Sequence, residues 1–102
     1  MSLEIRQTAT YVGKERWEWS VWVDGPSEEL DSIDYVTYIL HSTFHDPVRT
    51  IKDRSTNFRL STSGWGTFTI GAKVVQKDDS EILLQHELAL SYPDGAKVRA
   101  EV

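Results

Sequence analysis

Two loop segments of this chain hold side chains that could bind a flat polar group. The segments are residues 40–49 and residues 63–68. If Phe44 and Trp65 faced each other, the space between their rings would suit an electron-poor group such as an amide, because ring contacts of this kind are geometrically specific. Thr43 could offer a hydroxyl to that amide, and a ring nitrogen of His41 could orient the hydroxyl.

The glycines that flank Trp65 predict a tight turn. Glycine adopts positive φ without steric cost, and it lets another backbone approach closely. We therefore expect at least one of Gly64 and Gly66 to have a positive φ, which would present the indole at the turn with its neighbouring backbone amide exposed. Such a turn would supply a flat apolar wall and a hydrogen-bond donor together.

The same residues also have plainer interpretations. A phenylalanine or tryptophan in a small β-domain is often a packing residue, so Phe44 and Trp65 could belong to the core. His41 could be a structural histidine and Thr43 a turn residue, while Phe68 continues an alternating pattern that favours the core. Exposure separates the two interpretations: rings that line an open cleft indicate binding, and rings inside the core indicate a structural role.

Other kinds of chemistry find little support in the residues. His41 and His45 have a spacing that would align them on a helix, but Pro47 argues against a helix there, so we expect no metal site. The chain has no cysteine, no identifiable pair of carboxylates for acid–base work and no serine in a Gly-x-Ser-x-Gly setting. We therefore expect neither an enzyme nor a cofactor.

Charge and hydropathy limit the classes of molecule that this chain could bind. The formal net charge of −5 opposes binding to a phosphate backbone and suits a cationic partner such as a lysine-rich peptide. No apolar run approaches the roughly 18 residues that span a bilayer, and the N-terminus lacks the layout of a signal peptide. We expect a monomer that binds a protein or peptide, and neither nucleic acid nor membrane. A sandwich without disulfides suits the cytoplasm, or the nucleus if the source is eukaryotic.

The elements that must position the two loops are β-strands. Period-two alternation marks residues 17–23, 36–40, 68–74 and 82–90, with a weaker first strand over residues 3–11. Short strands between turn signals predict an all-β fold, an antiparallel sandwich or barrel, within one domain over residues 1–102. One helical turn over residues 27–30 could be capped by Ser27, and residues 92–102 could be a last strand, a linker or the cut end of a longer protein.

The order and spacing of these segments resemble the signature of the YEATS domain family. The matching residues are Leu40-His41-x-Thr43-Phe44-x-x-Pro47-x-Arg49 and Gly64-Trp65-Gly66-x-Phe68, with Trp19-x-Val21-x-Val23-x-Gly25 upstream. The resemblance covers about residues 17–75, and it is closer in character to the short bacterial members than to the eukaryotic histone readers. It implies an immunoglobulin-like β-sandwich that reads acylated lysine, acetyl or crotonyl, in a channel open at one end.

The resemblance also implies a role for each residue of the two loops. Phe44 and Trp65 would clamp the acyl amide. Thr43 would supply the hydroxyl to that amide, with His41 in support, and the backbone N–H of Trp65 would be the second hydrogen-bond donor.

Further residues follow from the same resemblance. Gly64 precedes the clamping tryptophan, and Gly66 and Phe68 would lie near the far end of the channel. Some family members have an additional pocket aromatic just before the strand of Trp19, and Trp17 is the candidate to replace it here.

Two functions from different classes stay open. The first is a non-catalytic reader of acylated lysine. The second is a β-sandwich adaptor that joins proteins in a bacterial signalling protein and does not bind acyl-lysine. In the adaptor, residues 41–44 and Trp65 would serve only to stabilise the fold.

Overall fold

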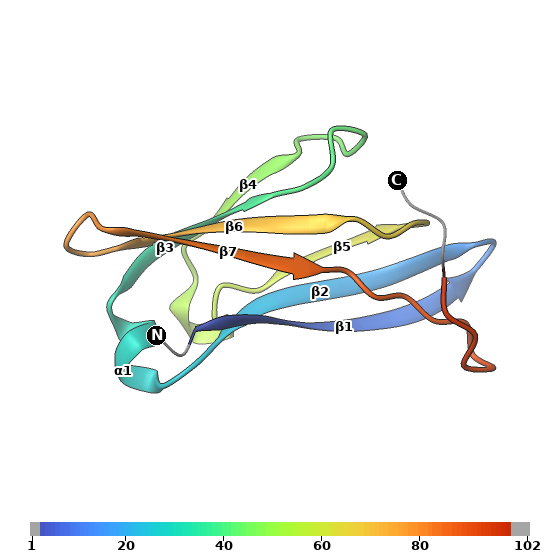
Figure 1. Cartoon of the computed structure of the whole chain (residues 1–102), viewed down its shortest axis with the longest axis horizontal. Coiled ribbons are helices and arrows are strands. Elements are labelled where there is room, and N and C mark those ends of the chain that lie inside the picture. The colour runs from blue at the N-terminus through green and yellow to red at the C-terminus, as the bar shows by residue number, and fades with distance from the viewer. Residues whose placement is uncertain (1–2, 99–102) are drawn as a thin grey trace.

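Two antiparallel sheets pack face to face in the computed structural model, which describes residues 3–98 (Figure 1). The three-stranded sheet contains, in spatial order, β1 (Glu4–Gly13), β2 (Arg16–Asp24) and β5 (Leu60–Gly64). The four-stranded sheet contains, in spatial order, β4 (Val48–Ile51), β3 (Ile33–Ile39), β6 (Thr69–Gln76) and β7 (Glu81–Glu87). A short helix α1 (Ser27–Asp31) and a 3-10 turn η1 (Arg54–Thr56) complete the described elements. The predicted antiparallel β-sandwich is confirmed.

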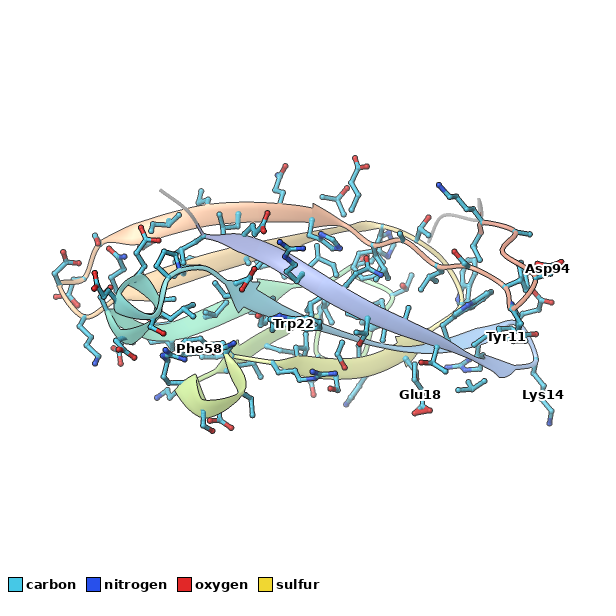
Figure 2. All side chains as sticks on the ribbon, turned by 90° about the horizontal axis from the view of Figure 1, so that it is seen from below. Tyr11, Lys14, Glu18, Trp22, Phe58 and Asp94 are labelled. Atoms are coloured by element: carbon cyan, nitrogen blue, oxygen red, sulfur yellow. The ribbon has the colours of Figure 1, made fainter. Side chains whose placement is uncertain are left out.

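The core lies between the sheets, and β2 shows why these residues form a strand. Trp17, Trp19, Val21 and Val23 alternate along β2, and all four are buried. Figure 2 shows Glu18, on the opposite face of β2, pointing away from the sheet. Burying each large apolar side chain contributes about 1.5–3 kcal/mol, so the alternation specifies which face of the strand turns inward.

Tyr38 of β3 anchors the centre of the second sheet. Its side chain is fully buried, and its hydroxyl donates to the backbone oxygen of Phe58 at 2.7 Å. Burial raises the pKa of this hydroxyl, since the phenolate would have to lose its water. The bond therefore ties β3 to the segment that leads into β5.

One side of the sandwich is closed by a glutamine. The Gln7 side-chain amide donates to the backbone oxygen of Ala89 at 2.7 Å and accepts its N–H at 2.9 Å, as a neighbouring strand would. His86 Nε2 lies 2.6 Å from the same Gln7 oxygen. Because that oxygen already acts as an acceptor, His86 donates to it. This Gln7 clamp joins the edge strands β1 and β7 of the two sheets.

The expected cap of the short helix needs correction. Helix α1 has Pro26 as its N-cap without a side-chain cap, so Ser27 is not the cap, because the Pro26 oxygen itself accepts the N–H of Leu30 at 3.0 Å. Pro47 takes part in the pairing that leads into β4. Its oxygen accepts the Leu40 N–H at 2.7 Å, and β4 begins at the next residue.

The end of the described chain forms a turn and a short bridge. Ser91 pairs with Lys97 in an isolated antiparallel bridge, and the Val98 N–H donates to the Leu90 oxygen at 2.9 Å. Residues 99–102, the rest of the segment that could be a last strand, a linker or the cut end of a longer protein, lie outside the described residues. No helix within residues 3–98 is long and apolar enough to cross a membrane.

Candidate functional site

A cleft of about 350 Å³ lies between the β3–β4 loop and the end of β5. Its lining residues are Arg16, Thr43, Phe44, His45, Arg49, Thr62, Ser63, Gly64 and Trp65. In Figure 1 the β3–β4 loop and the β5–β6 connection lie toward the same end of the sandwich as the β1–β2 hairpin. The cleft therefore unites the two segments that the sequence singles out.

Two larger hollows lie elsewhere on the surface. One of about 550 Å³ follows the exit of β7 and extends to Lys97 and Val98, the last described residues. The other, about 730 Å³, is on the outer face of the three-stranded sheet and is lined largely by hydroxyl-bearing and charged residues. Neither contains Phe44 or Trp65, so neither brings the two predicted aromatic walls together.

Backbone contacts and one arginine hold the β3–β4 loop. The Phe44 N–H donates to the His41 oxygen at 3.0 Å, which makes a tight turn at the start of the loop. The Arg49 side chain then donates to the backbone oxygens of Asp46 and His45, at 3.0 and 2.8 Å. Because Arg49 lies on the regular strand β4, these bonds fix the loop relative to the sheet and position the Phe44 ring.

Phe44 rests on an aromatic base. Its half-buried ring has its centroid 6.1 Å from that of Trp19 and 5.2 Å from that of Phe68. Phe68 is itself half-buried, and its ring also contacts Trp19 and His41. Phe68 therefore supports the cleft from beneath, as a partly buried packing residue, while Phe44 forms part of its surface.

Trp65 forms the exposed wall of the cleft. It is 48% exposed, and its ring contacts no other aromatic ring of residues 3–98. Since Phe44 and Trp65 line one cleft without touching ring to ring, neither is locked inside the core. This arrangement leaves the apolar faces of the site accessible.

The glycines beside Trp65 do not act as predicted. Within the described chain, the glycines with positive φ are Gly13 and Gly95, so the expectation for Gly64 and Gly66 is wrong. Gly64 instead continues β5 in register with β2, and its backbone is extended. A Cβ there would lie 3.5 Å from the Phe44 ring, an ordinary contact, so neither strain nor lack of space accounts for this glycine.

His41 and Thr43 are hydrogen-bonded at the rim. His41 Nδ1 accepts the backbone N–H of Thr43 at 3.2 Å and lies 3.0 Å from the Thr43 hydroxyl oxygen. Because Nδ1 accepts the N–H, it carries no proton, and the hydroxyl must donate to it. The exposed Thr43 oxygen is therefore left with lone pairs that can accept a hydrogen bond from a ligand. With its proton directed to His41, this hydroxyl is an acceptor toward a ligand and not the donor that the resemblance implies.

Trp17 does not complete the site, contrary to the expectation. Only 1% of it is exposed, and its ring packs against Tyr11 and Tyr92 with centroids 4.9 and 5.0 Å away. Its Nε1 donates to the Ser91 oxygen at 2.7 Å. Figure 2 shows Tyr11 near the tip of the β1–β2 hairpin, beside the C-terminal segment that carries Asp94. Trp17 therefore anchors that segment.

Sequence reasoning missed Arg16 as a lining residue. Trp17 pairs with Gly64 across β2 and β5, so Arg16, one residue earlier, comes level with Trp65 where the ladder ends. The sequence places Arg16 directly before Trp17, but this position indicates a lining residue only once the pairing of β5 with β2 is known. No group of three or more metal-ligating side chains occurs within residues 3–98.

Comparisons with known proteins agree on one family. The model of the prokaryotic YEATS domain matches residues 17–89. The protein AF-9 homolog of Saccharomyces cerevisiae is 38% identical over 77 residues, which cover 71% of this chain and 33% of the relative. The transcription initiation factor TFIID subunit 14b of Arabidopsis thaliana is 35% identical over 96 residues, which cover 84% and 35%. The chain thus spans about a third of the length of these curated relatives.

Solved structures of a yeast protein give the same result. The crystal structure of the yeast AF-9 homolog Yaf9 superposes with a TM-score of 0.73 at 30% identity, over 91% of this chain and 69% of that one. The Yaf9 YEATS domain bound to H3K27ac gives 0.65 at 26%, over 94% and 73%. The Yaf9 YEATS domain recognising an H3K122suc peptide gives 0.64 at 28%, over 87% and 69%. The chain therefore belongs to the prokaryotic YEATS domain family, as its sequence pattern predicted, and has the immunoglobulin-like β-sandwich of that family.

Proposed function

We propose that residues 1–102 form a single non-catalytic recognition module that binds an acylated lysine side chain, acetyl or crotonyl, between Phe44 and Trp65. The observation that carries this proposal is that both rings line one cleft and that Trp65 is 48% exposed. A flat amide between two ring faces gains contact area and specific geometry on both sides. The site needs no cofactor for this task.

The polar groups of the rim suit the two ends of an amide. The Thr43 hydroxyl donates to His41, so its oxygen can accept the N–H of the acylated lysine. The backbone N–H of Trp65 would donate to the acyl oxygen. Gly64 and Gly66, both buried, keep the backbone on either side of Trp65 free of side chains that would cover it.

Charge favours an acylated lysine over an unmodified one. No aspartate or glutamate lines the cleft, whereas Arg16 and Arg49 do. An ammonium group would lose part of its water in this cleft without finding a carboxylate, and it would meet like charge. Acylation removes the charge and makes the side chain acceptable.

The solved relatives support the same class of ligand. The Yaf9 YEATS domain has been solved with H3K27ac and with an H3K122suc peptide, and it shares 26–28% identity with this chain in those structures. An adaptor without ligand binding would be favoured if both rings lay in the core. The exposure of Trp65 therefore favours the reader.

Peptide titration tests the proposal. One peptide sequence is prepared with its lysine unmodified, acetylated or crotonylated, and binding is measured by isothermal titration calorimetry. Trp65→Ala and Phe44→Ala should each weaken binding of the acylated forms about tenfold or more, since each removes a wall worth about 2 kcal/mol.

Trp22→Ala is the matched control for that experiment. Trp22 is also a partly exposed indole, but it lies on the outer face of β2, under the guanidinium of Arg59. Its removal should change affinity less than about twofold. Each variant must first show a thermal midpoint close to that of the parent. If folded Trp65→Ala binds acyl-lysine as well as the parent does, or if the parent prefers unmodified lysine, the reader function is wrong.

A further inference from the structure

The cleft adjoins the larger hollow on the outer face of the three-stranded sheet. Arg16, Thr62 and Ser63 line both the cleft of about 350 Å³ and the hollow of about 730 Å³. A molecule that enters the cleft can therefore extend past these three residues onto the sheet. For a peptide whose acylated lysine occupies the cleft, the hollow is a path for the residues beside that lysine.

The lining of the hollow suits a polypeptide backbone. A hydroxyl group can both donate and accept a hydrogen bond, so it can bind either the N–H or the C=O groups that alternate along an extended peptide. Six residues of the lining carry such a group: Thr8, Thr10, Ser20, Ser61, Thr62 and Ser63. The hollow can thus hold an extended peptide, and its charged side chains decide which peptides it favours.

Arginines without a carboxylate partner gather on the joined surface of cleft and hollow. Within residues 3–98, Arg6 pairs with Glu4 and Asp24, and Arg54 pairs with Asp31. The other arginines of this part of the chain line the cleft or the hollow, and none has an ion pair with a residue of 3–98: Arg16, Arg49 and Arg59. In a chain with a formal net charge of −5, unpaired arginines at one place indicate a site for an anion.

Two of these arginines have donors to spare. The side chain of Arg16 is exposed where the cleft and the hollow meet, and it makes no hydrogen bond with any residue of 3–98. The guanidinium of Arg59 lies over the ring of Trp22, 5.0 Å from its centroid, and a contact through the flat face leaves the N–H groups at its edge free. Each of the two can therefore bind a carboxylate with parallel hydrogen bonds.

Nearby carboxylates do not cancel this positive charge. Among the described residues, Glu18 is the one carboxylate that lines the hollow, and none lines the cleft. Asp46 lies outside both linings, 3.5 Å from the His45 ring. The joined surface is therefore electropositive although the chain is acidic. Net charge acts mainly on the rate of encounter, whereas these short-range contacts determine which peptide is retained.

We propose that this domain recognises an acylated lysine flanked by acidic residues, and that the hollow on the three-stranded sheet holds the acidic flank through Arg16 and Arg59. The inference rests on the proposed reader function and specifies its partner. An exposed ion pair should improve the affinity up to about fivefold, the equivalent of about 1 kcal/mol. Because the pairs are exposed, the gain should decrease as the salt concentration rises.

Two acetyl-lysine peptides that differ only in having glutamate or glutamine at the flanking positions provide the test. Calorimetric titration at low salt should show that the parent binds the glutamate peptide about fivefold or more tightly than the glutamine peptide. Arg16→Gln and Arg59→Gln should each lower this ratio while leaving the affinity for the glutamine peptide close to that of the parent. Arg6→Gln is the matched control, because Arg6 is also exposed on this sheet but is paired and lines neither the cleft nor the hollow. It removes the same charge and should keep the parent's ratio.

The outcomes separate this inference from the reader function. If the parent binds both peptides equally but still prefers acetylated to unmodified lysine, the acidic flank is wrong and the reader function stands. The inference is also overturned if the folded Arg16→Gln and Arg59→Gln variants keep the parent's ratio, or if Arg6→Gln lowers it as much. Displacement of the glutamate peptide by a short single-stranded oligonucleotide would assign the surface to phosphates instead. If neither acetylated peptide binds more tightly than its unmodified form, both proposals fail.

Discussion

The Thr43 hydroxyl offers the sharpest test of the site, because valine removes it while keeping the shape of the side chain. In the free protein Thr43 is exposed, so water can replace its hydroxyl as a hydrogen-bond partner of the neighbouring groups. Thr43→Val should therefore change the free energy of unfolding by less than about 0.5 kcal/mol. In the complex, the amide N–H of the ligand would lie between two rings without its acceptor. Leaving a buried donor unsatisfied costs about 1–3 kcal/mol, which weakens binding about fivefold to more than a hundredfold.

His41 extends this prediction to a double-mutant cycle. Its Nδ1 is 3.0 Å from the Thr43 hydroxyl oxygen, so in the proposed complex it would act on the ligand only by orienting that hydroxyl. His41→Ala should therefore weaken binding in the parent but have little further effect once Thr43 is valine, so the two costs should not add. Thr43→Ser, which keeps the hydroxyl, should bind within about threefold of the parent, since it loses only a methyl contact.

Calorimetric titration of an acylated peptide against the four members of the cycle measures this coupling. The variants are compared only after thermal unfolding shows that each is folded. Additive losses would mean that His41 contributes independently of Thr43, and parental affinity in Thr43→Val would mean that the hydroxyl does not contact the ligand. The first result would refute the orienting role of His41, and the second would refute the assignment of the amide to Thr43.

Three further predictions concern stability. Tyr38→Phe should lower the free energy of unfolding by about 1–3 kcal/mol, because it leaves the buried carbonyl of Phe58 without its hydrogen bond. The control is Tyr35→Phe, which should change the free energy of unfolding by less than about 0.5 kcal/mol, since the Tyr35 hydroxyl bonds to no residue of 3–98. Equal midpoints of the two variants in thermal unfolding would contradict this prediction. Burial lowers the pKa of His86 below 6.5, so near this pH the unfolded state binds more protons than the folded state, and the free energy of unfolding should fall as the pH drops. In urea unfolding between about pH 7.5 and 5.5, His86→Asn should lose less stability than the parent does. Gly64→Ala should leave stability unchanged or raise it by up to about 1 kcal/mol, and a loss of more than about 1 kcal/mol would indicate a conformational role for this glycine.

Burial could be predicted from the sequence where it depends only on the side chains of one strand. The alternation of β2 predicts which of its residues are buried, because a residue's face depends only on its position along the strand. The family pattern also predicts that Phe44 and Trp65 come together, and both line the cleft. What the pattern predicts about the role of each residue in ligand binding stays a prediction.

The remaining features depend on partners that are distant in the sequence. Strand β5 has the sequence LSTSG, in which hydroxyl groups hide any apolar alternation, and its strand conformation comes from pairing with β2. Arg16 enters the cleft only through that register. Trp17 follows the core pattern of β2, but its aromatic partner Tyr92 lies far along the chain. The sequence pattern alone therefore could not predict that Trp17 packs against Tyr92 and does not line the cleft.

The hydrogen bonds from Arg49 to the backbone of the β3–β4 loop have a consequence for how this domain can evolve. Arg49 binds the backbone oxygens at positions 45 and 46, so the path of the loop does not depend on the side chain at position 45, which is 97% exposed in His45. Position 46 is more restricted, because Asp46 has a φ of 51°, a region that few residue types tolerate. Mutations at position 45 can therefore accumulate without moving the Phe44 ring, and related domains can acquire different preferences for the sequence around the lysine while retaining one clamp.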